Sequence, residues 1–337
     1  MAAMPAANGK ARVFSGIQPS GFLHIGNFLG AIRNWVRDQD RYDNIFCIVD
    51  LHALTLPIEP GALREQRLDL AATLIAAGID PQRSALFLQS DVSAHSELAW
   101  ILECFTPMGW LERMTAFKEK AGRQSDERVG AGLFNYPALM AADILLYDTN
   151  FVPVGEDQRQ HLELTRDLAQ RLNKRYGEIF VLPEPLIKQA GARIMGLDDP
   201  EKKMSKSVAV GAPGHAIGLM DPPDAVRRKF ARAQTDTEPA VRFPAGAGVL
   251  NLLEIYRTVR ELDQEAVRAE FEGRQYSALK QAVAEAVIEV LAPLQARYRA
   301  VRQDDAALLR TLKESAQRIE PTARATLARV QRAVGLS

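Results

Sequence analysis

The chain has 337 residues, of which 47% are hydrophobic and 25% are charged, as in ordinary globular proteins. This length allows a large core and favours two domains over one. Basic and acidic residues number 42 each, so the formal charge is zero and a surface that binds nucleic acid everywhere is excluded. No run of about 18 apolar residues occurs, which excludes an ordinary membrane-spanning helix. We therefore expect a cytoplasmic protein without a membrane partner.

Two features near the start of the chain bear on its environment. Residues 1–10 are small and Ala-rich, lack the apolar centre of a signal peptide, and predict a disordered tail. The two cysteines, Cys47 and Cys104, lie far apart and fit no metal-ligand spacing. Both stand in apolar segments, so we predict two buried thiols in a reducing compartment.

The first part of the chain alternates short apolar runs with helical patterns. These patterns predict strands at 12–17, 45–49 and 85–89, and helices at 24–36 and 60–77. Strands separated by helices of this length indicate a parallel sheet with right-handed crossovers. The expected fold class is α/β, with a Rossmann-like, doubly wound parallel sheet.

The remainder is mostly helical in pattern. Helical periodicity dominates from 96 to 176, residues 191–218 are rich in loop formers, and further helices are expected at 250–262, 276–299 and 305–330. We therefore predict two domains. A catalytic domain spans 11–207 and contains inserted helices at about 92–145, and an all-helical C-terminal domain spans 208–337.

The segment Gly16–Asn27 joins the first predicted strand to the first predicted helix, at the sheet edge where ligands bind. A helix N-terminus favours anions, and Gly21 and Gly26 let a base or phosphate approach the backbone. His24 and Asn27 can donate to phosphate oxygens. Taken alone, the segment is explained as well by a tight turn with a surface histidine.

A second segment, Lys202–Ser207, carries two lysines, Lys203 and Lys206, three residues apart. Two ammonium groups in a loop can follow negative charge onto a departing polyphosphate. The alternative for most lysine clusters is a solvated basic loop.

The two segments together match a known pair of motifs. Lys203–Ser207 reads KMSKS and resembles the second signature of class I aminoacyl-tRNA synthetases, while His24–Asn27 resembles their first signature, HIGH, in a variant that ends in asparagine. Residues 16–27, 46–55 and 135–173 resemble bacterial tryptophanyl-tRNA synthetases. The resemblance implies an enzyme that activates tryptophan with ATP and Mg²⁺, loads it onto tRNA(Trp), and forms a homodimer.

The residues of one helix face agree with tryptophan as the substrate. Tyr136, Met140 and Asp143 share a face at helical spacing. Indole N–H is only a donor, and a lone carboxylate on an apolar face needs a donor. The family places its indole-reading aspartate at Asp143 and the sister tyrosine enzymes carry glutamine in place of Met140. A structural salt bridge is the alternative for Asp143. By resemblance, the ring pocket also includes Phe14, Gln18, Val49 and His52.

The resemblance also assigns residues to ATP. The catalytic group would be His24, Asn27, Lys120, Lys203 and Lys206, with Mg²⁺ held by the ATP phosphates and no protein metal site. Ile194 and Met204 would flank adenine, and Gly155–Gln158 would meet the ribose, although a helix cap explains that stretch equally. The full nucleotide set is Gln18, Pro19, Ser20, Gly26, Asn27, Gly155, Glu156, Asp157, Gln158, Ile194, Lys203, Met204, Ser205, Lys206 and Ser207. His95, His161 and His215 are interpreted as structural or surface residues.

The last segment and one departure leave alternatives open. Residues 294–337 hold nine basic and four acidic residues, a strip that can follow an RNA backbone or simply be a solvated helix face. The resemblance implies that this domain binds the anticodon.

After the lysine motif the family usually continues Asp-Pro-Asn, whereas this chain has Val208–Val210. Two rival functions are another nucleotidyl-transferring enzyme and a non-catalytic RNA-binding paralogue. The paralogue would be expected to lose one of the signatures.

Overall fold

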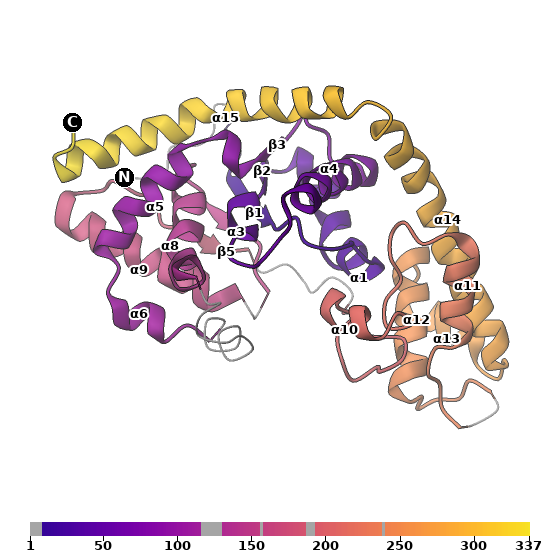
Figure 1. The fold of residues 1–337 in the computed structure, drawn as a ribbon. Coiled ribbons are helices and arrows are strands. Elements are labelled where there is room, and N and C mark those ends of the chain that lie inside the picture. Colours follow the sequence, from indigo (N-terminus) through magenta and orange to yellow (C-terminus); the bar gives the residue numbers. More distant parts are fainter. Residues whose placement is uncertain (1–8, 116–129, 156–157, 187–192, 238–239) are drawn as a thin grey trace.

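The computed structural model describes residues 9–115, 130–155, 158–186, 193–237 and 240–337 (Figure 1). Its five-stranded sheet has the order β3-β2-β1-β4-β5, and all neighbouring strands are parallel. The chain first moves outward from β1 and then crosses to its other side, so the topological switch point lies between β1 and β4. The strands are β1 (Arg12–Ile17), β2 (Asp43–Ile48), β3 (Ala85–Leu88), β4 (Phe151–Val152) and β5 (Glu184–Pro185). The predicted doubly wound α/β fold is confirmed, and β4 and β5 were not predicted.

Alternating residues of the strands enter two different cores. On β2, Phe46 and Ile48 face a core that includes α4 (Pro60–Ala77), while Ile45 and Cys47 face a core on the opposite side of the sheet. Successive side chains of a strand point to opposite faces of the sheet. A continuous apolar run therefore suits a strand that helices cover on both faces. Because Ile17 pairs with Ile48, the residues that follow β1 and β2 emerge side by side.

Helices form the two outer layers of this sheet. The predicted helix at 24–36 consists of α1 (Ile25–Asn27), a π-helical segment (Phe28–Ile32) and α2 (Arg33–Arg37). A single helical turn, α3 (Asp50–Ala53), follows β2. The opposite face is covered mainly by α5 (Ala94–Phe105), α6 (Met108–Glu112), α8 (Ala131–Leu145) and α9 (Arg159–Tyr176).

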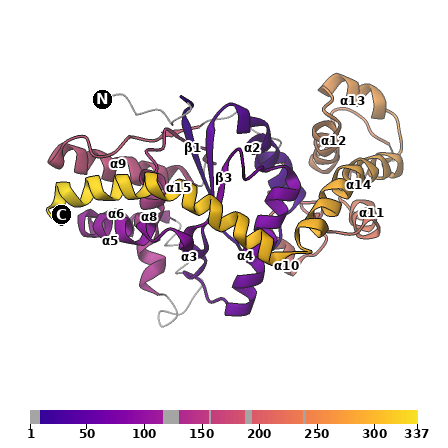
Figure 2. The same ribbon diagram turned by 90° about the horizontal axis from the view of Figure 1, so that it is seen from above.

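A second group of helices packs around a core of its own. It consists of α11 (Pro223–Ala231), α12 (Ala247–Arg260), α13 (Gln264–Phe271) and α14 (Tyr276–Val301), and it lies beside the sheet domain in Figures 1 and 2. The stretch 191–218, which was expected to be loop-rich, contains the short helix α10 (Lys206–Gly211) among its described residues. The last two residues of the lysine motif, Lys206 and Ser207, are therefore the first two residues of a helix.

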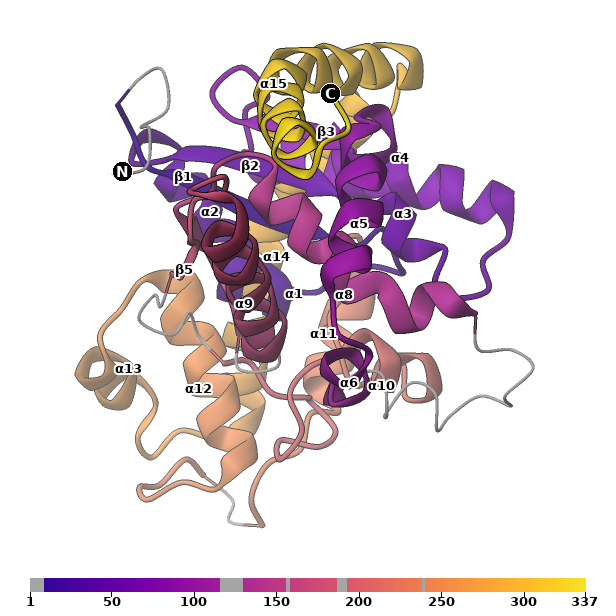
Figure 3. The same cartoon turned by 90° about the vertical axis from the view of Figure 1, so that its left-hand side faces the viewer.

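The last helix, α15 (Asp305–Val334), leaves the helical group and runs back along the sheet domain (Figures 1 and 3). Leu308 and Leu312 join the core beside α4, and Ala323 and Leu327 join the core on the other face of the sheet. Ser315 Oγ accepts a hydrogen bond from the backbone N–H of Leu86 at 2.8 Å. The boundary at 207/208 stays a prediction, but α15 is packed on the first domain.

Five arginines near the C-terminus donate to that first domain. Their partners include the carbonyl oxygen of Ala76 at 2.6 Å, the carboxylate of Glu97 at 2.7 Å and the carbonyl oxygen of Ile179 at 2.8 Å. Much of the basic strip thus joins the C-terminal helices to the sheet domain. The two alternatives from the sequence, an RNA-binding strip and a solvated helix face, did not include this role. The five are Arg297, Arg302, Arg318, Arg324 and Arg329.

Two smaller expectations can be checked here. Cys47 is buried, as predicted, whereas Cys104 on α5 is exposed, so that prediction was wrong. Within the described ranges, no helix is long and apolar enough to cross a membrane.

Candidate active site

Asp143 lies on α8 with 1% of its surface exposed, and its carboxylate is surrounded by donors. Its Oδ1 accepts from Gln89 Nε2 at 2.7 Å and from His95 Nδ1 at 2.6 Å, and its Oδ2 accepts from His52 Nε2 at 2.8 Å. Burial by itself raises the pKa of Asp143, but the hydrogen bonds from His52 and His95 outweigh burial, so the pKa lies below its ordinary value. The sequence interpretation of a lone carboxylate was wrong.

The hydrogen bonds leave a defined acceptor on Asp143. A carboxylate offers about four lone-pair positions, and three are used, so one position on Oδ2 is left. Burial raises the pKa of Tyr147 well above its ordinary value, so its hydroxyl stays protonated, and its oxygen lies 2.7 Å from His95 Nε2. An ionised carboxylate can only accept, so His95 Nδ1–H donates to Asp143. These contacts fix the direction of the Asp143 side chain.

Aromatic and apolar side chains surround this carboxylate. Phe14, 3% exposed, stacks on Tyr147 with ring centroids 5.9 Å apart. Tyr136 meets the His52 ring edge-on at 6.1 Å, and the Nε2 of Gln18 donates to the His52 carbonyl oxygen at 3.4 Å. Val49 and Met140 belong to the same core as Phe14. Printed distances thus link Asp143 to His52, Tyr136 and Gln18 and, through His95 and Tyr147, to Phe14. Val49 and Met140 share the same large core, and the role of all seven residues remains a prediction.

The two signature segments touch each other at their glycines. A Cβ on Gly26 would lie 3.6 Å from Met204 Cβ, and one on Gly21, whose φ is +60°, would lie 3.5 Å from Lys206 Cδ. Lys206 Nζ donates to the carbonyl oxygen of Ser20, in the turn after β1. Burial lowers the pKa of Lys206. The second lysine of KMSKS is therefore held directly over the first signature.

The first signature turn is closed by its own residues. His24 is 3% exposed, and its backbone N–H donates to Asn27 Oδ1 at 3.1 Å. The backbone N–H of Ile25, the first residue of α1, donates to the Ile217 carbonyl oxygen at 2.9 Å. The surface histidine considered as an alternative is thus excluded, because His24 is buried between this turn and the lysine loop.

Two predicted adenine contacts lie at the lysine loop. Ile194 and Met204 are 1% and 2% exposed, and their side chains belong to the helical core; their contact with a base stays a prediction. Lys203 is exposed, and Ser205 caps α10 by accepting from the Val208 N–H at 3.4 Å. Ser207 lies within α10, but its side chain falls outside the described part.

Several predicted residues cannot be placed. Lys120, Glu156 and Asp157 lie outside the described residues. Gly155 and Gln158 flank this last gap, and the Gln158 N–H donates to the Gly155 carbonyl oxygen at 3.0 Å just before α9. Their part in ribose binding stays a prediction.

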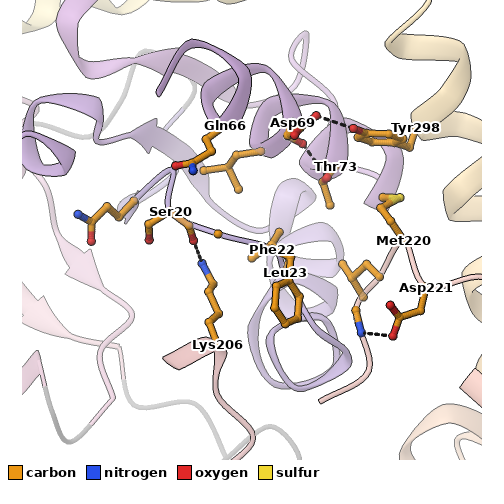
Figure 4. A pocket seen from close by; sticks show the side chains of 15 residues that line it. Ser20, Phe22, Leu23, Gln66, Asp69, Thr73, Lys206, Met220, Asp221 and Tyr298 are labelled. Atoms are coloured by element: carbon orange, nitrogen blue, oxygen red, sulfur yellow. Dashed lines mark hydrogen bonds between the residues drawn. The ribbon is translucent and has the colours of Figure 1, made fainter. Parts of the chain in front are cut away.

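A pocket of about 280 Å³ opens beside the signature turn (Figure 4). Lys206 reaches Ser20 at one end. At the other end, Asp69 accepts from the Tyr298 hydroxyl at 2.5 Å and Asp221 accepts from a backbone N–H at 2.8 Å. The basic end suits a phosphate group, and the acidic end does not.

Comparison with known proteins identifies the family. A sequence profile for the family described as tRNA synthetases class I (W and Y) matches residues 6–292. The chain belongs to this family. A tryptophan–tRNA ligase of Wolinella succinogenes is 55% identical to it over 97% of this chain and 99% of that protein. One from Caldanaerobacter subterraneus subsp. tengcongensis is 52% identical over 96% of this chain and 98% of that protein.

Solved structures of the class I synthetases agree with this assignment. The tryptophanyl-tRNA synthetase of Mycoplasma pneumoniae superposes with a TM-score of 0.86, at 37% identity, and covers 97% of this chain and 98% of that one. The Campylobacter jejuni enzyme, complexed with ADP and tryptophan, gives a TM-score of 0.85 at 34% identity and covers 96% of this chain and 100% of that one.

Sequence reasoning missed part of this synthetase site. Gln89 and His95 bind Asp143, and His161 Nε2 lies 2.6 Å from the Tyr136 hydroxyl. Each comes from a segment far from its partner in sequence, and a single histidine at a helix start carries no signal for such a contact. His95, interpreted from the sequence as a structural or surface residue, is fully buried and contacts Asp143 and Tyr147, partners that the sequence did not name.

His24 makes the stability of this synthetase depend on pH. Burial, and then the charges of Lys206, Lys203 and His215, lower its pKa from 6.5 to about 4. The unfolded chain therefore takes up the proton first, so stability is full above pH 6.5 and falls as the pH drops towards 4, by about 3 kcal/mol. Denaturant unfolding at several pH values should show this loss, and a His24→Asn variant should show a shallower slope. Equal slopes would contradict a buried neutral His24.

Proposed function

We propose that this chain is a tryptophan–tRNA ligase, which forms tryptophanyl-adenylate and pyrophosphate from L-tryptophan and ATP and then transfers tryptophan to tRNA(Trp). The observation that carries the proposal is the buried Asp143 carboxylate with one acceptor position left, set among aromatic rings. Indole supplies one N–H donor on a flat apolar ring, so it can complete the hydrogen bonds of Asp143 while its ring lies against aromatic side chains. The names of the relatives support the same substrate.

Specificity follows from the same geometry. A phenylalanine ring in this pocket has no donor for Asp143, and a buried acceptor that loses its partner costs about 1–3 kcal/mol, or more for a charge. A site built around such a hydrogen bond can reject the analogue that lacks it without a separate editing step. Met140 adds an apolar wall where a phenol would need a polar partner.

Activation needs no nucleophilic side chain. The tryptophan carboxylate is ionised at neutral pH and attacks the α-phosphate of ATP directly. Positioning and neutralisation of charge do the rest. Lys206 is held at the Ser20 carbonyl oxygen, and Lys203 is exposed. Both are proposed to stabilise the negative charge that develops on the leaving pyrophosphate. His24 and Asn27 shape the turn beneath the phosphates, and Lys120 would assist.

Mg²⁺ is proposed to arrive with ATP. The ion is proposed to be bound by phosphate oxygens and water, where it would neutralise charge on the triphosphate. The nucleotide itself would contact the set predicted from sequence, through backbone groups at Ile194 and Met204.

The decisive test is amino-acid-dependent exchange between ATP and pyrophosphate, measured with each of the twenty amino acids. Exchange with tryptophan alone is expected, by more than about a hundredfold over tyrosine and phenylalanine. Charging of tRNA(Trp) transcripts then tests the second step. Exchange with another amino acid, or none with any, would refute the assignment and favour a different nucleotidyl-transferring enzyme or a non-catalytic RNA-binding paralogue.

The helical group α11–α14 is proposed to contact the tRNA anticodon. This proposal comes from the family resemblance and from the position of the group outside the sheet domain (Figure 2). Five arginines of the C-terminal strip contact the sheet domain, as Arg324 does through Glu97. We therefore assign the RNA contacts mainly to α11–α14. We place the enzyme in the cytoplasm, where its tRNA is.

We also propose a symmetric homodimer joined through α5 and α6. Trp100 on α5 is 68% exposed and Met108 on α6 is 62% exposed. Large apolar side chains of this kind are typical of protein contacts. In a twofold interface each residue is present on both subunits, so one substitution changes the interface at two places.

Trp100→Glu is expected to weaken the dimer about a thousandfold, because a loss of about 2 kcal/mol is counted on both sides. Sedimentation or light scattering should then show monomers at micromolar concentration. Leu250→Glu, at a 46% exposed position on α12 of the helical group, is the matched control and should remain dimeric. A Trp100→Glu protein that stays dimeric would rule out this interface.

A further inference from the structure

His215 is buried directly behind the lysine loop. It follows α10, is 0% exposed, and its ring presses against the turn that leads into KMSKS. A Cβ on Gly196 would lie 2.1 Å from His215 Cε1, so only glycine allows this approach. The Leu197 N–H donates to the His215 carbonyl oxygen at 3.1 Å, and the Gly196 N–H to the Lys202 carbonyl oxygen at 2.8 Å. The ring is therefore enclosed by the loop that carries the signature lysines.

Both ring nitrogens of His215 face acceptors. Nδ1 lies 2.5 Å from Asp198 Oδ1, and Nε2 lies 3.3 Å from the backbone carbonyl oxygen of Lys203. A carbonyl oxygen can only accept, and so can an ionised carboxylate. A neutral imidazole has a single N–H and would satisfy one of the two. Only the doubly protonated imidazolium donates to both.

The charged neighbours of His215 come from the loop and from the first signature. Asp198, whose side chain is 40% exposed, and Asp199 precede the lysines, Lys203 is itself a partner, and His24 lies across from the ring. The hydrogen bond from Lys202 lowers the pKa of Asp199, and the charge of His215 adds to that effect. Burial keeps His24 neutral. The imidazolium thus has nearby carboxylates to balance its charge.

We propose that His215, as an imidazolium, is a positioning residue that ties the backbone of the signature Lys203 to Asp198 and so directs the Lys203 side chain into the nucleotide site. This inference rests on the proposed function. The residues after KMSKS, Val208–Val210, have no polar side chain, and Val210 is 82% exposed, so they offer Lys203 no side-chain hydrogen bond. His215 touches no substrate and acts only through Lys203.

Two substitutions separate the two hydrogen bonds. In His215→Gln the amide nitrogen takes the place of Nε2 and can still donate to the Lys203 carbonyl oxygen, whereas in His215→Asn it takes the place of Nδ1 and reaches only Asp198. We expect His215→Gln to keep tryptophan-dependent exchange within about twofold and His215→Asn to lose about tenfold in kcat. KM for tryptophan should not change in either, because the ring pocket belongs to a different core.

The pH dependence gives a second readout. The bond to the Lys203 carbonyl oxygen weakens when the imidazolium loses its proton, so wild-type exchange should fall once the ring is deprotonated. His215→Gln keeps every lysine but has no titrating ring, so its profile should lack this fall. Asp198→Asn, at a partly exposed position, offers the ring a donor as well as an acceptor, which allows a neutral ring to keep its bond to Lys203 and flattens the profile.

Nitrogen-15 NMR of the five histidines at neutral pH reads the protonation state directly. The signal of His215 is the one that disappears in His215→Gln. If it shows both ring nitrogens protonated, the proposal is supported. A singly protonated His215, or equal losses in both His215 variants with an unchanged pH profile, would overturn it. If both His215 variants fail to fold, the wild-type spectrum and the Asp198→Asn profile decide. If the wild type shows no exchange with tryptophan, the proposed function fails, while the spectrum still decides the state of His215.

Discussion

Replacing Asp143 with alanine is expected to lower kcat/KM for tryptophan by about a thousandfold. The change removes the acceptor for the indole N–H and leaves the donors of His52, His95 and Gln89 without a partner in a buried site, which costs about 3–5 kcal/mol. ATP binding should stay nearly intact, because the signature segments that are proposed to hold ATP lie in the turn before α1 and in the lysine loop. Exchange kinetics and calorimetric ATP binding measure the two effects separately.

Asp143→Asn is the informative companion to the alanine variant. It keeps the shape of the side chain but places an amide donor against donors from His52 or His95, so it should lose selectivity as severely as alanine does. Thermal unfolding of both variants checks that the core around Tyr147 remains folded. An alanine variant that kept full selectivity for tryptophan would defeat the pocket assignment.

The second large effect is expected at Lys206. Lys206→Ala removes an ammonium group held at the Ser20 carbonyl oxygen, where we propose that charge grows on the leaving pyrophosphate, and should lower kcat by about a hundred- to a thousandfold. Since the lysine is proposed to act in the transition state, KM for tryptophan should change little. Single-turnover formation of the adenylate measures this loss without a contribution from product release.

A neighbouring lysine offers the control. Lys202 is exposed, pairs with Asp199 at 2.8 Å, and lies outside the proposed site, so Lys202→Ala should keep wild-type rates. Comparable losses in both variants would mean that general loop charge matters and that Lys206 has no special position. A Lys206→Ala enzyme with normal kcat would remove this residue from the mechanism.

Long patterns in the sequence predicted the fold well. The helix at 60–77 appears with these bounds, since Pro60 suits a first helical turn and Gly78, at φ 113°, ends it. Strands β4 and β5 were missed because each has two residues, too few to show a period, and Pro185 is tolerated only because β5 lies at the sheet edge.

The candidate site shows a different limit. The motifs predicted His24 and Lys206 because signatures are local in sequence. The hydrogen bonds around Asp143 join residues 48 to 91 positions apart, and no local pattern links them. The helical pattern at 305–330 predicted the helix α15, but such a pattern cannot say which core receives an apolar face, since any apolar partner satisfies it.

The return of α15 to the sheet makes the catalytic unit discontinuous in sequence. Its cover over β3 is translated long after β3 itself, so the sheet domain cannot complete its core on the ribosome until residues near 330 have emerged. No single cut releases two intact halves: a fragment ending at 207 would expose the apolar surface that Leu312 and Leu327 cover. A circularly permuted chain that begins at α15 and reaches the sheet through a linker would be the natural way to obtain that domain alone.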